Sequence, residues 1–299
     1  MNELLILKDR IVAKVFRILT LNIIFPLVYK IAARKPVDNN KVVFIELRME
    51  HISNSFKVVF DELVSKYNFD VHTHFLLNGS GRKYLYLSRC IDMLKDIATA
   101  KYVFLNEGSN CIGSIDLRPE TKIAQLWHGC GAFKKFGLST ADLIFGETRK
   151  QQLRHPFNKN YSLVTISSPE VEWAYKEAMN INEDGIVKAT GCSRTDVFYD
   201  EKFIESAYKT LYDVVPQAKG KKVILYAPTF RGRVAKATTS RMLDVKMFYE
   251  NFGDDYILLF KHHPHAKKRP IVPTEYSEFA MDVTKQWKLK ICFVFLIFV

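Results

Sequence analysis

Two histidine-containing segments carry the residue types that acid–base chemistry needs. His128 follows the strand expected at 121–127 and precedes Gly129, where the missing side chain lets a ligand come close to the backbone. Lys261, His262 and His263 follow a second apolar run near the C-terminus. An imidazole accepts or releases a proton near neutral pH because its unperturbed pKa is about 6.5. The two segments therefore predict a reaction in which a proton moves.

Two further segments place glycine, hydroxyl and arginine residues directly after apolar strands. Gly191 opens a turn that leads to Arg194 and Asp196, while Thr229 and Arg231 follow a later strand. A guanidinium can make two parallel hydrogen bonds to phosphate oxygens, so these segments favour a phosphorylated ligand. An ordinary exit from a strand into a loop has the same pattern, and both interpretations stay open for each segment taken alone.

A metal site is the competing interpretation of the histidine cluster at 262, 263 and 265. No H-E-x-x-H pattern and no carboxylate partner is near, and Pro264 splits the cluster. The five cysteines are scattered without a C-x-x-C pair, which argues against a zinc site and against a disulfide framework. Reduced thiols fit a cytosolic compartment. We expect no metal and no other cofactor.

The elements that must position these residues alternate between strand and helix. Such alternation predicts a doubly wound α/β domain, in which ligands bind at the carboxyl ends of strands. For this first domain, residues 36–204, we expect strands at 42–45, 70–77, 102–105, 121–127, 163–166 and 186–189, and helices at 53–66, 88–98 and 168–179.

A second α/β unit, residues 205–299, begins with a helix predicted near residues 203–214. Two such units in tandem put a site in the cleft between them. Within the second unit we expect strands at 223–226 and 256–260 and a helix at 243–251.

The charge balance is basic and its N-terminal part stands out. The chain has 44 Lys and Arg against 32 Asp and Glu, a formal net charge of +12, which suits anionic partners. The basic residues are spread and no nucleic-acid motif occurs, so we expect no nucleic-acid partner. Residues 1–35 interleave apolar clusters with seven basic and two acidic residues.

That N-terminal segment has two interpretations. It is either an amphipathic helix that lies on an anionic membrane or a helix that packs on the protein's own core. Its uncharged stretch, Ile18 to Tyr29, is shorter than the roughly 20 residues of a spanning helix. The flanking basic residues favour the membrane surface.

Taken together, the four segments contain W-H-G, G-x-x-R-x-D, A-P-T-x-R and K-x-H-P motifs in that order. They stand at Trp127–Gly129, Gly191–Asp196, Ala227–Arg231 and Lys261–Pro264. In these motifs the chain resembles the CDP-glycerol glycerophosphotransferase family, which includes teichoic acid polymerases and primases. The resemblance covers roughly residues 40 to 285.

The resemblance implies a GT-B-like fold of two Rossmann-like domains and catalysis by His128 and His263. His128 would act as general base on an acceptor hydroxyl, whose oxygen attacks the β-phosphorus of CDP-glycerol or a similar CDP-polyol, and CMP leaves. The acceptor would be a lipid-linked glycan or a polyol phosphate polymer at the cytoplasmic face of the membrane, with the enzyme held there peripherally. The residues expected to bind the donor and its phosphates are Gly129, Arg194, Asp196, Thr229, Arg231 and Lys261.

The chain departs from the family pattern over residues 285–299. This segment has no acidic or turn residues and closes on nine apolar ones. We expect a truncated or frameshifted end that leaves the second domain partial; a genuine edge strand or a membrane-touching tail is the alternative. Two functional alternatives also stay open: a nucleotide-sugar glycosyltransferase of cell-surface polysaccharide synthesis, and an inactive membrane-associated homologue.

Overall fold

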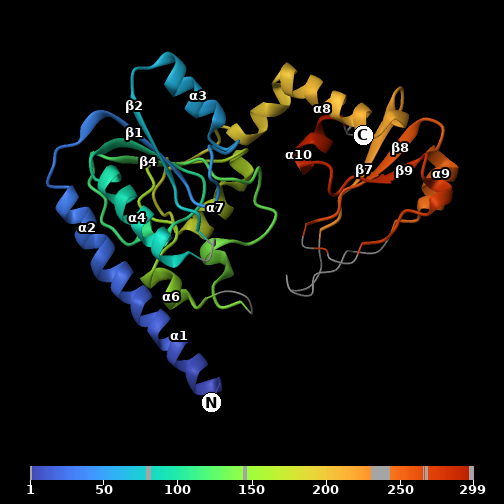
Figure 1. Cartoon of the computed structure of the whole chain (residues 1–299). Helices are drawn as coiled ribbons and strands as arrows, with labels where there is room; N and C mark the ends of the chain where they lie inside the picture. The colour runs from blue at the N-terminus through green and yellow to red at the C-terminus, as the bar shows by residue number, and fades with distance from the viewer. Residues whose placement is uncertain are drawn as a thin grey trace. The chain divides into compact units, whose positions relative to one another are not determined.

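The structure, a computed structural model, has two compact units, Met1–Asp196 and Val197–Val299 (Figure 1). Each unit has its own sheet and its own hydrophobic core, and each is described by itself. The residues that the structure describes are 2–78, 82–143, 147–229, 243–264, 266 and 269–295.

Unit 1 is built on a six-stranded parallel sheet with the strand order β2-β1-β3-β4-β5-β6. Because β1 lies between β2 and β3, the order of the strands reverses beside it, and such a reversal is where parallel sheets bind ligands. The strands lie close to the predicted ranges: β1 (Asp38–Glu46), β2 (Asp70–Phe75), β3 (Ala100–Leu105), β4 (Lys122–Gln125), β5 (Leu163–Thr165) and β6 (Val187–Lys188).

Both faces of this sheet are covered, as the continuous apolar strands predict. Val42 and Phe44 of β1 face α3 (Lys57–Lys66), whereas Val43 and Ile45 face the larger core beneath α4 (Lys83–Ile97). Three further helices of this unit are α5 (Asn110–Gly113), α6 (Arg149–Arg154) and α7 (Glu172–Met179). The Ser168 side chain caps the 3-10 turn before α7.

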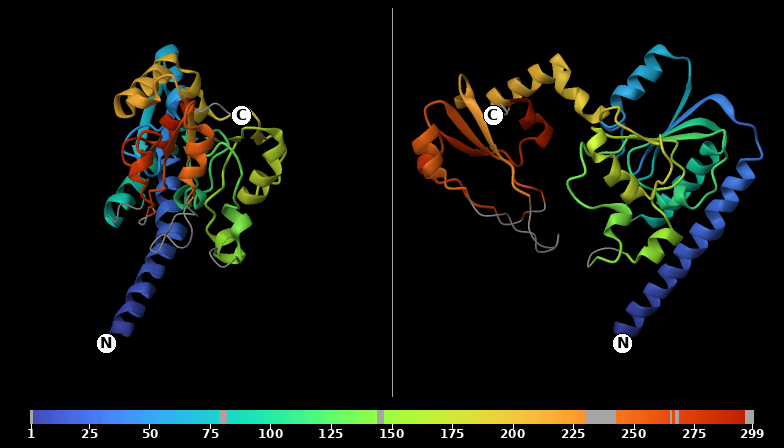
Figure 2. Two further views of the ribbon diagram at one scale, coloured as in Figure 1. Left: turned by 90° about the vertical axis from the view of Figure 1, so that its right-hand side faces the viewer. Right: turned by 180° about the vertical axis from the view of Figure 1, so that it is seen from behind.

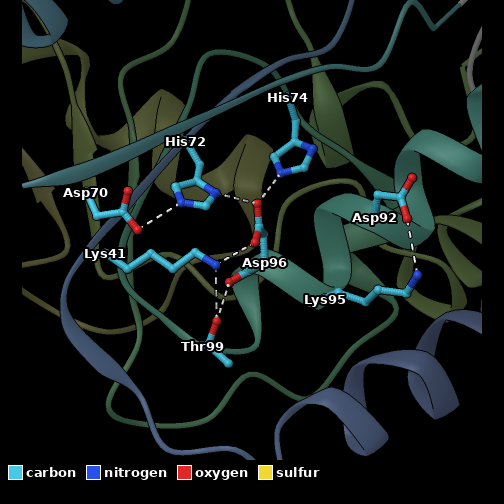
Figure 3. A network of polar contacts seen from close by, with 8 residues as sticks. All are labelled: Lys41, Asp70, His72, His74, Asp92, Lys95, Asp96 and Thr99. Atoms are coloured by element: carbon cyan, nitrogen blue, oxygen red, sulfur yellow. Dashed lines mark hydrogen bonds and ion pairs between the residues drawn. The ribbon is translucent and has the colours of Figure 1, made fainter.

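A network of polar contacts ties α4 to the edge of the sheet (Figure 3). Asp96, in the last turn of α4, accepts hydrogen bonds from His72 and His74 of β2 and from Lys41 of β1. His72 contacts Asp70 through its other ring nitrogen. Burial alone would raise the pKa of Asp96, but these hydrogen bonds outweigh it and hold the pKa well below its usual range.

One long helical rod precedes the sheet (Figures 1 and 2). It consists of α1 (Asn2–Leu19), a π-helical turn (Thr20–Ile24) and α2 (Phe25–Ala32). Phe25 and Tyr29 are buried on the α4 side, and the Tyr29 hydroxyl accepts the backbone N–H of Arg118 at 3.1 Å. The interpretation of a helix packed on the protein's own core is therefore confirmed for this face of α2.

The opposite face of the rod is apolar and exposed. We call it the exposed stripe: its residues recur every three or four positions, which places them on one side of a helix. By length and composition the run Ile11–Ala32 is long enough to cross a membrane, contrary to the expectation from the uncharged stretch, although core helices and signal sequences pass the same test. The exposed stripe consists of Val12, Phe16, Leu19, Ile23, Leu27 and Ile31.

Unit 2 has a three-stranded parallel sheet over its described residues, in the order β7-β8-β9. The strands are β7 (Lys222–Tyr226), β8 (Tyr256–Phe260) and β9 (Ala280–Asp282), and β8 coincides with its predicted range. One face packs against α8 (Glu201–Val214) and α10 (Leu289–Cys292), and the other against α9 (Val245–Phe252).

The segment predicted to be atypical is part of this second core. Trp287, Cys292 and Phe295 are all less than 7% exposed, and the ring of Phe295 lies 5.8 Å from that of Tyr208 on α8. Residues 289–295 form a short helix followed by a 3-10 turn. The edge-strand interpretation is therefore wrong over these residues, because they are helical and their apolar side chains pack against α8.

Candidate functional site

His128 stands just beyond β4, at the carboxyl end of the parallel sheet, and is exposed. Its Nδ1 lies 2.9 Å from the backbone carbonyl oxygen of Asn106, which follows β3. A carbonyl oxygen can only accept, so Nδ1 carries the hydrogen and Nε2 of the neutral ring carries a lone pair. No hydrogen bond joins Nε2 to another residue that the structure describes. The arrangement leaves Nε2 able to accept a proton.

The backbone of Trp127, directly before His128, has an unusual conformation. Its φ of 59° lies in the left-handed region, which costs energy for a bulky residue and persists only when the surroundings enforce it. The buried side chain of Gln125 accepts the Trp127 N–H at 3.0 Å, and the indole packs on Phe136 and Tyr175. A strained backbone beside a candidate base is a mark of functional sites.

Two buried polar residues support this arrangement, and the sequence analysis missed both. Glu46, 1% exposed at the end of β1, accepts hydrogen bonds from the Asn106 side-chain amide at 2.7 Å and from the backbone N–H of Ser53. Asn106 in turn presents its carbonyl oxygen to His128. The ends of β1, β3 and β4 thereby join in one chain of hydrogen bonds. In the sequence, the feature that could have pointed to Glu46 is a single acidic residue at the end of an apolar strand.

The Gly191 segment reaches the same edge of the sheet. Gly191 has a φ of 93°, as a glycine turn requires, and its N–H bonds to the carbonyl oxygen of Ile166 after β5. Arg194 donates to the carbonyl oxygen of His128 at 2.6 Å. The Cys192 thiol, whose pKa burial raises to about 11, donates to the Gly129 carbonyl oxygen at 3.8 Å. The structure thus brings the first two predicted motifs together.

Other expectations for this unit find less support in the local geometry. Gly129 has no positive φ, and a Cβ there would make only ordinary contacts, the nearest at 3.5 Å, so the fold itself does not require glycine. Asp196 is exposed at the end of unit 1. The predictions that Gly129 and Asp196 bind a ligand stay predictions.

In unit 2, the Lys261 segment follows β8 and is mostly buried. The Lys261 ammonium donates to the carbonyl oxygen of Thr284 at 2.7 Å, and burial lowers its pKa. His262 is 1% exposed, burial lowers its pKa, and neither ring nitrogen has a hydrogen-bond partner among the described residues. His263 is half-buried. Of the three, His263 is therefore the side chain that solvent reaches best.

The remaining predicted residues of unit 2 divide into two groups. Thr229 follows β7 and is exposed. Arg231 and His265 lie outside the described residues. Across the part of the chain that the structure describes, no group of three or more His, Cys, Asp and Glu residues is arranged to hold a metal ion.

Comparison with known proteins places this geometry in a family. The chain is 33% identical over 262 residues to the teichoic acid poly(ribitol-phosphate) polymerase of Bacillus spizizenii, which covers 87% of this chain and 41% of the relative. It is 30% identical over 273 residues to the teichoic acid ribitol-phosphate primase of the same organism, over 89% of this chain and 69% of the relative. The chain thus spans less than half the length of the polymerase.

A solved structure confirms the fold class. The wall teichoic acid polymerase TagF superposes with a TM-score of 0.63 at 15% identity, over 97% of this chain and 73% of that one. The chain therefore has the GT-B-like α/β fold of that polymerase. The sequence profile of the CDP-glycerol:poly(glycerophosphate) glycerophosphotransferase family matches residues 27–296, which include most of the segment predicted to be atypical. The chain belongs to this family.

Proposed function

We propose that the chain transfers a polyol phosphate from a CDP-activated polyol to a hydroxyl of a teichoic-acid-type acceptor and releases CMP. The observation that carries this proposal is the hydrogen bond of His128 Nδ1 to the Asn106 carbonyl oxygen, which leaves Nε2 ready to take a proton. Family membership supplies the class of donor.

In the proposed step, Nε2 of His128 removes the proton of the acceptor hydroxyl. The acceptor oxygen forms a bond to the β-phosphorus of the donor, and the bond from that phosphorus to the CMP oxygen breaks. CMP leaves with the electron pair of that bond. Cations near the phosphates lower the barrier of such reactions, and we assign this role to His263 and Arg231.

Ribitol phosphate is the donor group that the comparisons favour. The two relatives described above are both named for ribitol phosphate, and each aligns over more than 85% of this chain. We therefore propose CDP-ribitol as the donor, with CDP-glycerol as the alternative that a competition assay separates.

The test is CMP release from CDP-ribitol and from CDP-glycerol in the presence of a teichoic-acid-type acceptor, with the parent chain and its His128→Ala and His263→Ala variants. We expect release from one donor and a loss of about 10²–10⁴-fold in kcat for His128→Ala. Unchanged unfolding midpoints would show that the variants are folded. No release from either donor, or full activity in His128→Ala, would overturn the proposal.

We also propose that the chain works as a peripheral protein on an anionic membrane surface. The exposed stripe on the N-terminal rod supports this, together with the basic residues that flank it. Co-sedimentation with vesicles is the measurement. Binding should be stronger to phosphatidylglycerol than to phosphatidylcholine and should fall when Ile23→Glu and Leu27→Glu are combined. Equal binding by that double variant would contradict the proposal.

A further inference from the structure

A cavity of about 340 Å³ lies between the N-terminal rod and the core of unit 1. Ligand pockets in proteins range upward from about 300 Å³, so the space is large enough for part of a small molecule. Its walls are mostly apolar: Leu21 and Phe25 from the rod, and Tyr86 and Leu87 from α4. Such walls suit an aliphatic chain.

Two residues that line the cavity, Thr20 and Ser109, have a buried hydroxyl without a hydrogen-bond partner among the described residues. The Thr20 side chain is 6% exposed, and its Oγ1 has no hydrogen-bond partner among the described residues. A buried hydroxyl without a partner is costly, and such groups usually meet a ligand or water. Thr20 begins the π-helical turn of the rod, and π-helical turns occur frequently at functional sites. Rotation of the Thr20 side chain about χ1 would bring this hydroxyl, which is closed to solvent in the structure, to an acceptor oxygen of an occupant.

A positive charge stands beside that hydroxyl. Arg17 also lines the cavity and lies three positions before Thr20, so the two side chains are neighbours on one face of the helix. Arg17 pairs with Glu147 at 3.1 Å, but both side chains are more than 40% exposed, so an anion has access to the guanidinium. Burial, followed by the charges of Arg17 and Arg154, lowers the pKa of nearby His155.

The cavity also borders the exposed stripe. Phe16 is 41% exposed on the stripe and at the same time lines the cavity. An aliphatic chain that contacts the stripe therefore has a continuous apolar path past Phe16 to Leu21 and Phe25. The phosphate of the same molecule would remain at the Arg17 end.

We propose that this cavity binds an amphiphile made of a phosphate group and an aliphatic chain. Arg17 and the Thr20 hydroxyl bind the phosphate, and the apolar walls take the adjoining part of the chain. The phosphate amphiphile has two possible sources: a bilayer phospholipid, or the lipid-phosphate anchor of an acceptor. The second source rests on the proposed function, whereas binding itself does not.

The first experiment is calorimetric titration of the full chain with dodecyl phosphate below its micellar concentration, without any nucleotide donor. Inorganic phosphate tests binding of the head group alone, and dodecanol tests binding of the aliphatic chain alone. We expect dodecyl phosphate to bind at least 10-fold more tightly than either half. Arg17→Gln and Thr20→Val should each weaken binding several-fold, while Thr20→Val leaves the unfolding midpoint equal or higher, because an unpartnered hydroxyl is removed.

Matched variants separate this site from general attraction to a basic apolar surface. Arg34→Gln removes the same charge from an exposed residue in the turn just after the rod, and Leu289→Trp adds the same bulk to unit 2. Both should bind as the parent does, whereas Leu87→Trp should fill the cavity and abolish binding. Equal weakening by Arg34→Gln and Arg17→Gln, or undiminished binding by Leu87→Trp, would overturn the proposal.

Competition identifies the source of the amphiphile. A photoreactive dodecyl phosphate should label peptides that contain residues 16–25 or 86–87. Displacement by phosphatidylglycerol would indicate a bilayer lipid, and displacement by a polyprenyl phosphate would indicate an acceptor anchor. Label that neither lipid displaces, or label spread evenly along residues 11–31, would refute the site. Because no donor is present, a failure here is independent of any failure of the transferase assay.

Discussion

At the scale of single residues, the carboxylate of Glu46 accepts a hydrogen bond from the side chain of Asn106, whose backbone carbonyl oxygen accepts one from His128. Glu46→Gln places an amide N–H where an acceptor is needed, so the Asn106 contact weakens while the volume stays the same. We expect kcat to fall about 10-fold or more with the donor dissociation constant unchanged, because the residue positions the base without touching substrate.

The control for this prediction is a measurement of the tautomeric state of the His128 imidazole by NMR. The ¹⁵N shifts of His128 should show a mixture of tautomers in Glu46→Gln and a single one in the parent. A loss of stability without a change of tautomer would mean that Glu46 only supports the fold.

The Asp96 network makes stability depend on acid pH. Because its folded pKa lies below the unfolded value of about 3.9, the charged form stabilises the fold fully above that value, and this contribution disappears as pH falls toward the folded pKa. Asp96→Asn should cost about 1.5–3 kcal/mol at pH 7. In urea titrations the deficit should shrink below about pH 4.

Asp92→Asn is the matched control, since Asp92 lies on the same helix with its side chain 60% exposed. It should change stability by less than about 0.5 kcal/mol. A deficit in Asp96→Asn that stayed constant down to pH 2 would contradict the assignment.

Sequence reasoning found the residues that carry recognisable motifs and missed those that hold them. His128 and Arg194 lie in motifs with glycine and apolar neighbours. Glu46 and Asn106, in contrast, are single polar residues 60 positions apart that meet only because β1 and β3 are neighbours in the sheet. No local pattern encodes such a pairing.

At the scale of elements, Gly137 shows how closely the loop after β4 approaches α7. It has a φ of 53°, and a Cβ there would stand 2.2 Å from the carbonyl oxygen of Ala178. Gly185 has a φ of 80° with nothing within 4 Å of the same position. We expect Gly185→Ala to cost about 1–2 kcal/mol from the left-handed backbone alone. Gly137→Ala should cost roughly 1–3 kcal/mol more, because the backbones must separate.

Urea unfolding of the two variants measures this difference. Gly137→Ala should also reduce CMP release, since the same loop carries Phe136 against Trp127. Equal destabilisation by the two substitutions would show that the loop moves away freely.

Strands that coincide with apolar runs were predicted, including the short β5 and β6, whereas β9 was missed. β8 was found because Tyr256–Phe260 is a continuous apolar run. The sequence Ala280–Asp282 is not a continuous apolar run, and its strand is defined by its pairing with β8. The helix expected from Ser53 begins at Lys57, because residues 54–56 form a turn in which the Ser53 carbonyl oxygen accepts the N–H groups of Phe56 and Lys57.

At the scale of the whole molecule, each unit has its own core, so the two should respond separately to substitution. Phe295→Ala removes a ring that is 4% exposed beside Tyr208 and Trp287. Truncation of a buried phenylalanine costs about 3–5 kcal/mol. We expect hydrogen exchange to accelerate in the β7–β9 sheet and to stay slow in β1, β3 and β4.

Leu289→Ala, at a side chain 41% exposed, is the control and should leave hydrogen exchange unchanged in both sheets. Faster exchange in both sheets of Phe295→Ala would show that the units unfold as one.

The packing of residues 287–295 against α8 also sets an order of events during synthesis. The ribosome makes α8 well before Trp287, Cys292 and Phe295, at about 5–20 residues per second. About ten seconds therefore pass between the synthesis of α8 and the synthesis of the residues that pack on its apolar face. All residues of unit 1 are available as soon as residue 196 has emerged. Unit 1 can therefore fold while unit 2 is still being synthesised. Chaperones that bind exposed apolar helices have their longest opportunity in that interval.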